Sequence, residues 1–115
     1  MDKKETNTLM HYGTTDAQIE DWKLLWGKDQ VMKCELPLDD NGDAFLGAVL
    51  KAPDRKVLGE FEKWSDKNPD KAKEIMINGC FLTRKDEVKA NAGLFAGAFD
   101  ACAQLIPIRR AILKN

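Results

Sequence analysis

Hydrophobic residues recur with helical spacing soon after the start of the chain. Residues 14–27 carry an apolar stripe at positions i, i+3, i+6 and i+7, which predicts a short amphipathic helix. Thr14, Thr15 or Asp16 can cap its first turn, and Gly27 can end it. Residues 1–13 show no such period and are predicted to form a flexible leader. The stripe consists of Ile19, Trp22, Leu25 and Trp26.

The hydrophobic period changes from helix to strand after Gln30. Residues 31–36 alternate, which predicts a strand with one buried face, and Pro37 places the end of that strand at a sheet edge. The Asn41-Gly42 pair within residues 38–43 indicates a turn, and residues 44–50 read as the returning strand of a β-hairpin. Two strands alone are marginal in water, so the hairpin must pack on helices or pair with another chain.

Three more helices are predicted after the hairpin. The first starts near Pro53 or Asp54, the second has Asn68 as N-cap with Pro69 in its first turn, and the last starts at Asn91. Residues 83–90 are charged and predict a loop or a single turn, and Pro107 separates the last helix from a short helical tail. The predicted fold class is mostly helical α+β, with an N-terminal helix, one β-hairpin, three helices and a C-terminal helical tail. Residues 14–115 are predicted to form a single compact domain.

Composition and charge narrow the classes of partner. The 115 residues are 43% apolar, which excludes a wholly disordered chain, and no apolar run approaches the roughly 20 residues of a membrane helix. The formal net charge of −1 gives no overall attraction to phosphate, which disfavours nucleic acid as a partner. We therefore expect neither a membrane nor a nucleic acid to be the main partner.

Residues with catalytic or metal-binding chemistry are sparse. Cys34, Cys80 and Cys102 lack the short spacing of zinc or redox motifs, which predicts buried free thiols. His11 is the only histidine and lies in the leader, so a nucleophile has no base. The acidic turn around Asn41-Gly42 lacks the glutamate that would complete a calcium loop. We expect no enzyme activity, no cofactor and no metal.

Candidate interface residues come from three parts of the chain. The first helix bears two tryptophans, a residue type that is enriched in binding hot spots. The last helix has small residues at spacing four, which lets another helix approach closely, and the C-terminal stretch is basic and amphipathic. The candidates are Trp22, Trp26, Gly93, Gly97, Ala101, Arg109 and Arg110.

Residues 31–115 resemble a family of small phage and prophage proteins described as tail-assembly-chaperone-like. Within these residues, the predicted hairpin ends in the segment LKAPDRK at residues 50–56, and the segment NPDKAKEIMINGCFLT follows from Asn68. The first helix lies outside it, and the acidic glycine-rich loop of the family is replaced here by residues 83–87. The matching positions are Pro69, Lys71, Ala72, Glu74, Ile75, Asn78, Cys80, Leu94, Phe95 and the Ala111–Lys114 stretch.

The resemblance implies a non-enzymatic role. Proteins of this family are thought to coat the long apolar tape-measure protein until tail-tube subunits replace them. The resemblance also implies that the partners are other tail proteins and that the chain is located in the bacterial cytoplasm. Two alternatives stay open, a structural head–tail or virion accessory subunit and a small regulatory binder of a host protein or nucleic acid. A homo-oligomer also stays open.

Overall fold

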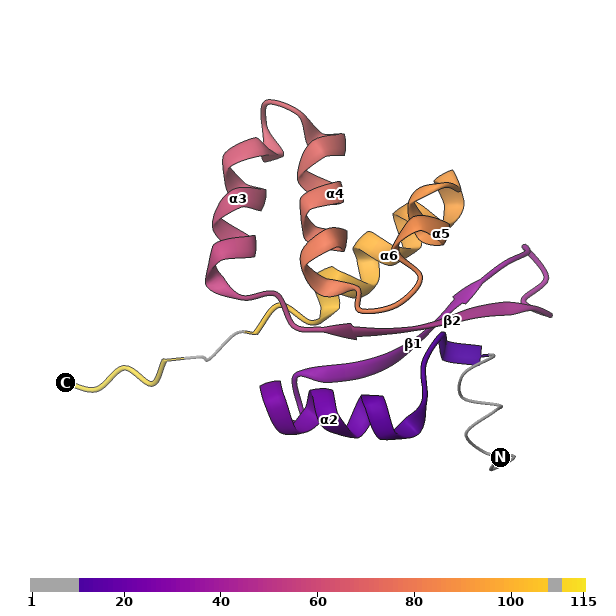
Figure 1. Ribbon diagram of the computed structural model, residues 1–115. Coiled ribbons are helices and arrows are strands. Elements are labelled where there is room, and N and C mark those ends of the chain that lie inside the picture. The colour runs from indigo at the N-terminus through magenta and orange to yellow at the C-terminus, as the bar shows by residue number, and fades with distance from the viewer. Residues whose placement is uncertain (1–10, 108–110) are drawn as a thin grey trace.

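The computed structural model describes residues 11–107 and 111–115, and its helices and hairpin form three layers (Figure 1). Helix α2 (Asp16–Trp26) lies on one face of a two-stranded antiparallel sheet. The other face carries α3 (Arg55–Ser65), α4 (Pro69–Cys80), the single-turn helix α5 (Lys85–Lys89) and α6 (Ala92–Gln104). The fold is mostly helical α+β, as predicted, and α5 occupies the segment predicted as a loop or single turn.

Helices α2, α3, α4 and α6 begin where side chains cap their first turns. Thr15, Asp54, Asn68 and Asn91 each accept a hydrogen bond from the backbone N–H three residues later, at distances between 2.9 and 3.2 Å. Each such cap typically contributes about 1 kcal/mol to stability. These local signals explain why the predicted helix starts are confirmed.

The sheet is a hairpin of β1 (Val31–Pro37) and β2 (Phe45–Lys51), paired from Val31 opposite Lys51 to Pro37 opposite Phe45. The connecting loop is longer than a two-residue turn, and the Leu38 N–H closes it by donating to the Ala44 carbonyl at 2.8 Å. Within the Asn41-Gly42 pair only Gly42 has a positive φ, of 73°. The hairpin is therefore confirmed, but its turn is not the tight type in which both residues are left-handed.

Both faces of β2 are covered, and β1 buries one residue on each face, Val31 and Leu36, whereas the sequence predicted one buried face for β1. On one face, Leu36, Ala48 and Leu50 join the core formed by α4, α5 and α6. On the other face, Val31 and Val49 pack with Ile19 of α2. Ala48, Val49 and Leu50 are each at most 2% exposed, so β2 is buried on both faces. This burial explains why its sequence is an apolar run without alternation.

The outer edge of β2 is also covered. The Leu82 N–H donates to the Val49 carbonyl at 2.8 Å, and the Val49 N–H donates to Oγ1 of Thr83 at 2.9 Å. The Arg84 side chain donates from Nε to the Gly47 carbonyl at 3.0 Å. The segment that follows α4 thus closes this edge of the sheet.

Part of the predicted leader is held in place. His11 and Tyr12 are helical, and Oγ1 of Thr83 donates to the Tyr12 carbonyl at 2.7 Å. The backbone of His11 lies directly against Gly47 of β2. Residues 11–13 therefore belong to the folded domain, which corrects the prediction of a loose leader at these positions, and residues 1–10 lie outside the described residues.

Two other predictions are only partly right. The stripe of α2 buries Ile19 but leaves Leu25 68% exposed, because a hairpin of two strands covers only part of the helix. Residues 111–115 form no helix, and Ile112 and Leu113 are 84% and 92% exposed. Pro107 offers no N–H to continue α6, and no contact covers these side chains. The predicted helical tail is wrong at these positions, and residues 108–110 lie outside the described part of the chain.

We predict that Gly47→Ala lowers the free energy of unfolding by about 2 kcal/mol or more, because its Cβ would collide with the His11 carbonyl, which is backbone and cannot rotate away. The control is Gly59→Ala in α3, where a Cβ meets no atom within 4 Å. That change should raise stability by up to about 1 kcal/mol. Urea unfolding of both variants measures this, and equal effects would contradict the contact.

Candidate functional site

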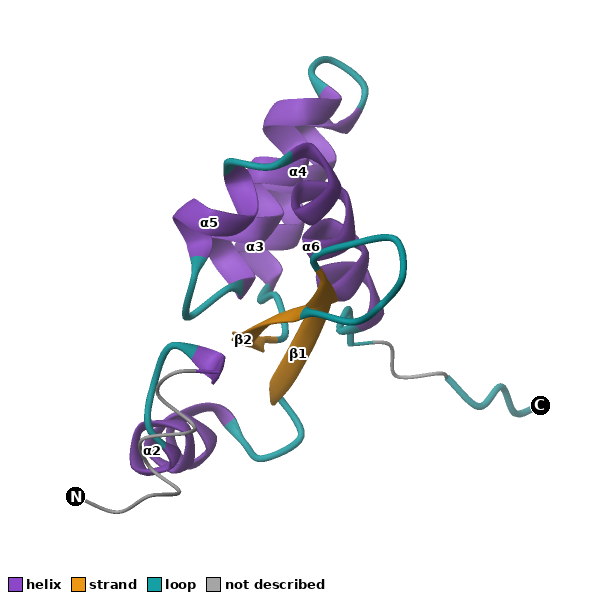
Figure 2. Ribbon diagram, turned by 90° about the vertical axis from the view of Figure 1, so that its right-hand side faces the viewer, coloured by secondary structure: helices purple, strands orange, loops and turns teal. Residues whose placement is uncertain are grey.

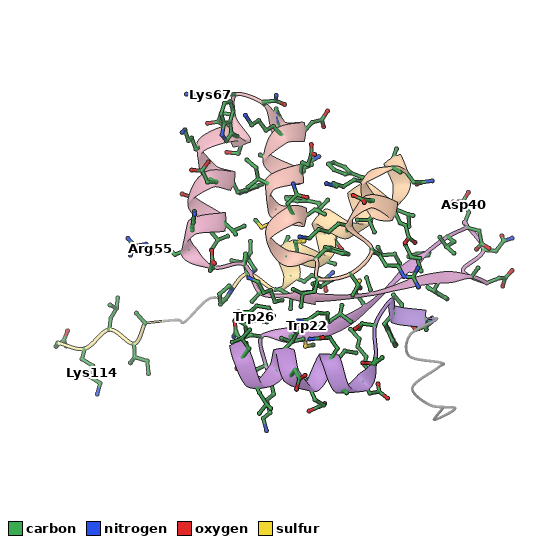
Figure 3. All side chains as sticks on the ribbon, viewed as in Figure 1. Trp22, Trp26, Asp40, Arg55, Lys67 and Lys114 are labelled. Atoms are coloured by element: carbon green, nitrogen blue, oxygen red, sulfur yellow. The ribbon has the colours of Figure 1, made fainter. Side chains whose placement is uncertain are left out.

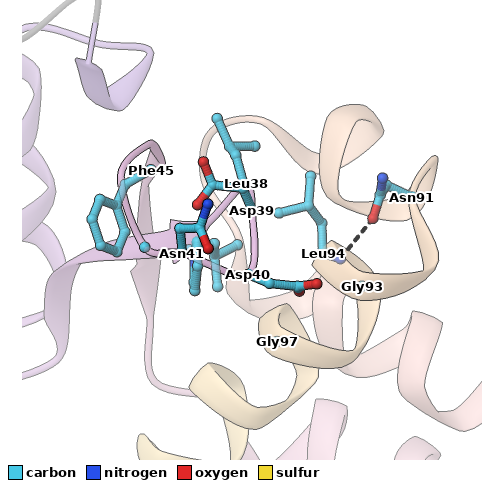
Figure 4. A pocket seen from close by; sticks show the side chains of 12 residues that line it. Leu38, Asp39, Asp40, Asn41, Phe45, Asn91, Gly93, Leu94 and Gly97 are labelled. Carbon is cyan, nitrogen blue, oxygen red and sulfur yellow. Dashed lines mark hydrogen bonds between the residues drawn. The ribbon is translucent and has the colours of Figure 1, made fainter.

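Two hollows of the described surface adjoin along β1 and α6, and we call them together the β1–α6 groove. One hollow, of about 720 Å³, lies between the hairpin loop and the start of α6, and the next, of about 390 Å³, follows β1 toward the end of α6. Figure 4 shows the first hollow from close by. Both share Leu36, Pro37 and Gly97. The apolar lining includes Met32, Cys34, Leu36, Leu38, Phe45, Leu50, Leu94, Ala101 and Leu105.

The small residues of α6 give the groove its space. Gly93 and Gly97 line the first hollow, and Gly97 and Ala101 line the second. A Cβ at Gly97 would lie 3.3 Å from Cδ2 of Leu36, so a larger side chain there would project into the groove. The sequence predicted these three residues as a close-approach surface, and the structure places all three along the groove.

Acidic side chains surround the groove. Asp39 and Asp40 lie in the hairpin loop, and Figure 4 shows Asp40 on the side of the loop that faces α6. Oδ1 of Asp39 accepts a hydrogen bond from the Asp43 N–H at 3.1 Å. Asp100 lines the second hollow, and Lys33 and Glu35 border it at the edge of β1 with their side chains on the other face of the strand. An acidic rim repels phosphate and attracts cationic side chains.

The edge of β1 beside the groove has unpaired backbone groups. Just beyond the ends of the two strands, the Gln30 carbonyl accepts from the Ala52 N–H and the Leu38 N–H donates to the Ala44 carbonyl. Even-numbered residues of β1 therefore point their backbone groups inward, toward β2. The odd-numbered Val31, Lys33 and Glu35 point theirs outward. No described residue gives these outward groups a hydrogen bond. The two edges of the hairpin thus differ, since β2 is covered and β1 is open.

Glu35 is the centre of a polar cluster at this edge. Nε2 of His11 lies 2.6 Å from Oε1 of Glu35, the Tyr12 hydroxyl donates to the same oxygen at 3.4 Å, and Nζ of Lys33 lies 5.1 Å from the Tyr12 ring centre. Partial burial of the phenol, and then the negative charge of Glu35, raise the pKa of Tyr12 above its usual value. The cluster holds the side chains of Lys33 and Glu35 on the α2 side of the strand.

The three cysteines differ in exposure. Cys80 and Cys102 are fully buried between α4 and α6, as predicted, and the Cys102 thiol donates to the Met76 carbonyl at 3.9 Å. Cys34 is only half-buried and lines the groove, so the prediction of a buried thiol is wrong there. Burial, and then the charge of Glu35, raise the pKa of the Cys34 thiol. This shift is the opposite of the one that activates a cysteine nucleophile.

The other predicted interface residues do not join the groove. Trp22 and Trp26 lie on α2, and Figure 3 shows both on the side of that helix that faces the sheet, across the hairpin from α6. Trp22 is half-buried against Ile19 and Val49, and Trp26 is 38% exposed beside Lys51. Arg109 and Arg110 lie outside the described residues.

The open edge of β1 is the feature of this site that the sequence analysis missed. Pro37 indicated an edge, but only at the end of the strand. The alternation of Lys33 and Glu35 with apolar residues is a local signal for such an edge, because charged residues are common on edge strands. That signal does not tell which of the two strands is covered.

Comparison of the chain with protein-family models, with curated proteins and with solved structures gives no match. Within residues 11–107 and 111–115, no three His, Cys, Asp or Glu side chains group closely enough to hold a metal ion. No helix of the described chain is both long and apolar enough to cross a membrane.

We predict that Glu35→Gln lowers the pKa of Tyr12, because the variant removes the negative charge that disfavours the phenolate. The raised pKa in the folded chain means that Tyr12 contributes stability below its usual pKa of 10.0, and that this contribution is lost as the pH rises through the folded pKa. Titration of Tyr12, the only tyrosine, by its phenolate absorbance measures the shift. An unchanged titration would contradict the cluster.

We predict that one of the three thiols reacts in the folded chain and that this thiol is Cys34. The reaction with a disulfide reagent should be slower than that of a free thiol at the same pH, since the pKa of Cys34 is raised. Unfolding should release all three thiols. Mass spectrometry of the labelled peptides identifies the site, and fast labelling of Cys80 or Cys102 before unfolding would contradict the packing.

Proposed function

We propose that the chain is a non-enzymatic protein-binding protein of the tail-assembly-chaperone kind, which holds a segment of the tape-measure protein in the β1–α6 groove. The groove carries the proposal, because it combines an apolar floor, small residues that leave room, and unpaired backbone groups along one side. These are features of a surface that binds polypeptide. The resemblance of residues 31–115 to the chaperone-like family supplies the kind of partner.

The chemistry of the groove supports binding rather than catalysis. Its lining contains no histidine or serine, and its one thiol, Cys34, has a raised pKa. An activated nucleophile needs a nearby base or a lowered pKa. The acidic rim also weighs against the nucleic-acid alternative, since it would repel a phosphate backbone.

The proposal is tested by capture of a partner with the tagged full chain in bacteria that are producing phage. We expect recovery of the long tape-measure protein, with the chain absent from finished particles. Recovery of the chain within purified particles would favour the structural subunit instead. Recovery of host proteins alone would overturn the tail assignment.

A matched pair of variants tests the groove itself. Gly97→Leu places a side chain in the groove beside Leu36, where it occupies space that the partner needs. We therefore expect capture of the partner to fall about tenfold or more, because overpacking one contact typically costs about 1–3 kcal/mol. Gly59→Leu makes the same replacement at an open position of α3 and should leave capture unchanged. Circular dichroism checks that both variants fold. Equal capture by the two would remove the groove from the proposal.

A further inference from the structure

The layer of helices is wider than the sheet on which it packs. Neighbouring helix axes lie about 8–10 Å apart, whereas neighbouring strands lie about 4.8 Å apart. Helix α4 packs on α6 at its side, and α6 contacts β1. Figure 2 shows α6 above β1, on the side of the hairpin away from β2. Helix α6 therefore overhangs the open edge of β1, and the second hollow of the groove lies between them.

We infer that the partner segment binds as a third, antiparallel strand of the sheet, in the space between the open edge of β1 and the overhanging α6. This inference rests on the proposed function for its partner and adds how that partner is recognised. The outward N–H and C=O groups of Val31, Lys33 and Glu35 supply the hydrogen bonds. Antiparallel pairing lets each of these residues exchange two bonds with the residue opposite.

The charges on β1 specify the segment. Residues opposite each other in a sheet share a face, so a basic residue belongs opposite Glu35 and an acidic residue opposite Lys33. Positions opposite Met32, Cys34 and Leu36 face α6 and require aliphatic side chains, for which Gly97 and Ala101 leave room. Because the segment is antiparallel to β1, its N-terminal residue lies opposite Leu36 and its C-terminal residue opposite Met32. Its five side chains are therefore, in order, aliphatic, basic, aliphatic, acidic and aliphatic. Its first residues lie nearest Asp39 and Asp40, which favour positive charge there.

A second copy of the whole domain does not fit this space. Pairing β1 with β1 of another copy would place the two strands about 4.8 Å apart. Both overhanging α6 helices would then lie on the same side of the sheet, closer than the 8–10 Å that packed helices need. A single extended segment without its own helical cover meets no such conflict.

Two synthetic peptides test the recognition, TVKVEVT as the predicted segment and TVEVKVT with the charges exchanged. We expect TVKVEVT to bind the full chain roughly tenfold more tightly, because two cross-strand pairs change from like to opposite charge. On binding, exchange of the Lys33 and Glu35 amide protons should slow. The amide of Cys34 already bonds to β2 and should change little. Titration with NMR detection measures both effects.

Charge-exchanged protein variants complete the experiment. The double variant Lys33→Glu with Glu35→Lys should reverse the preference between the two peptides, and Lys67→Glu, at the distant turn between α3 and α4, should leave it unchanged (Figure 3). Equal affinities, or binding without protection of Lys33 and Glu35, would overturn the third strand. Tighter binding of TVEVKVT to the unaltered chain would overturn its antiparallel direction.

Failure of this inference can be distinguished from failure of the proposed function. Capture of the tape-measure protein without slowed exchange at Lys33 and Glu35 leaves the function standing and removes the strand. Peptide binding with slowed exchange, but without capture of a tail protein, supports the third strand and removes the proposed function. A third outcome is that exchange at Lys33 and Glu35 is already slow in the free chain and becomes fast in the double variant Ile112→Asp with Leu113→Asp. The chain's own C-terminal residues would then occupy the edge of β1, and this result also overturns the inference.

Discussion

Coverage of the hairpin is the constraint on which the rest of the structure depends. A two-stranded sheet buries too little to be stable alone, and here Ala48, Val49 and Leu50 are enclosed by helices from both sides. Enclosure from the α2 side requires the end of the leader to lie against Gly47, where only a glycine leaves room for the His11 backbone. The N-terminal helix and the C-terminal helices are thus joined into one domain through a single strand.

The same strand makes the two edges of the sheet unequal. Residues 82–84 satisfy the outward groups of β2, and they do so with a backbone amide, a hydroxyl and a guanidinium. Arg84 adopts a left-handed φ of 62° there, a conformation that costs a non-glycine residue free energy and is held by its bonds to Gly47 and Glu87. All of this cover lies at β2, and so the open edge falls on β1, directly under α6.

The sequence predicts the elements of this fold better than their contacts. Caps such as Asn68 and Asn91 are local, and the stripes of α4 and α6 follow from periodicity alone, so these features can be predicted without tertiary information. The pairing of Val49 with Leu82 and Thr83 joins residues more than 30 positions apart, and no local pattern marks it. For the same reason the small-residue surface of α6 could be predicted from its spacing, but not the strand edge that lies beneath it.

The features that define the groove also restrict what can enter it. An open strand edge invites unspecific pairing, which proteins limit with charged residues, proline and short strands. Lys33 and Glu35 place opposite charges two residues apart, Pro37 ends the strand, and α6 overhangs the position where a neighbouring domain would have to lie. Under the proposed function, these features disfavour a strand that presents the wrong charges or that carries its own helix. The segments that satisfy these conditions form a narrow class of extended chains, and such selectivity is what the proposed binding role requires, because one partner must be held among many.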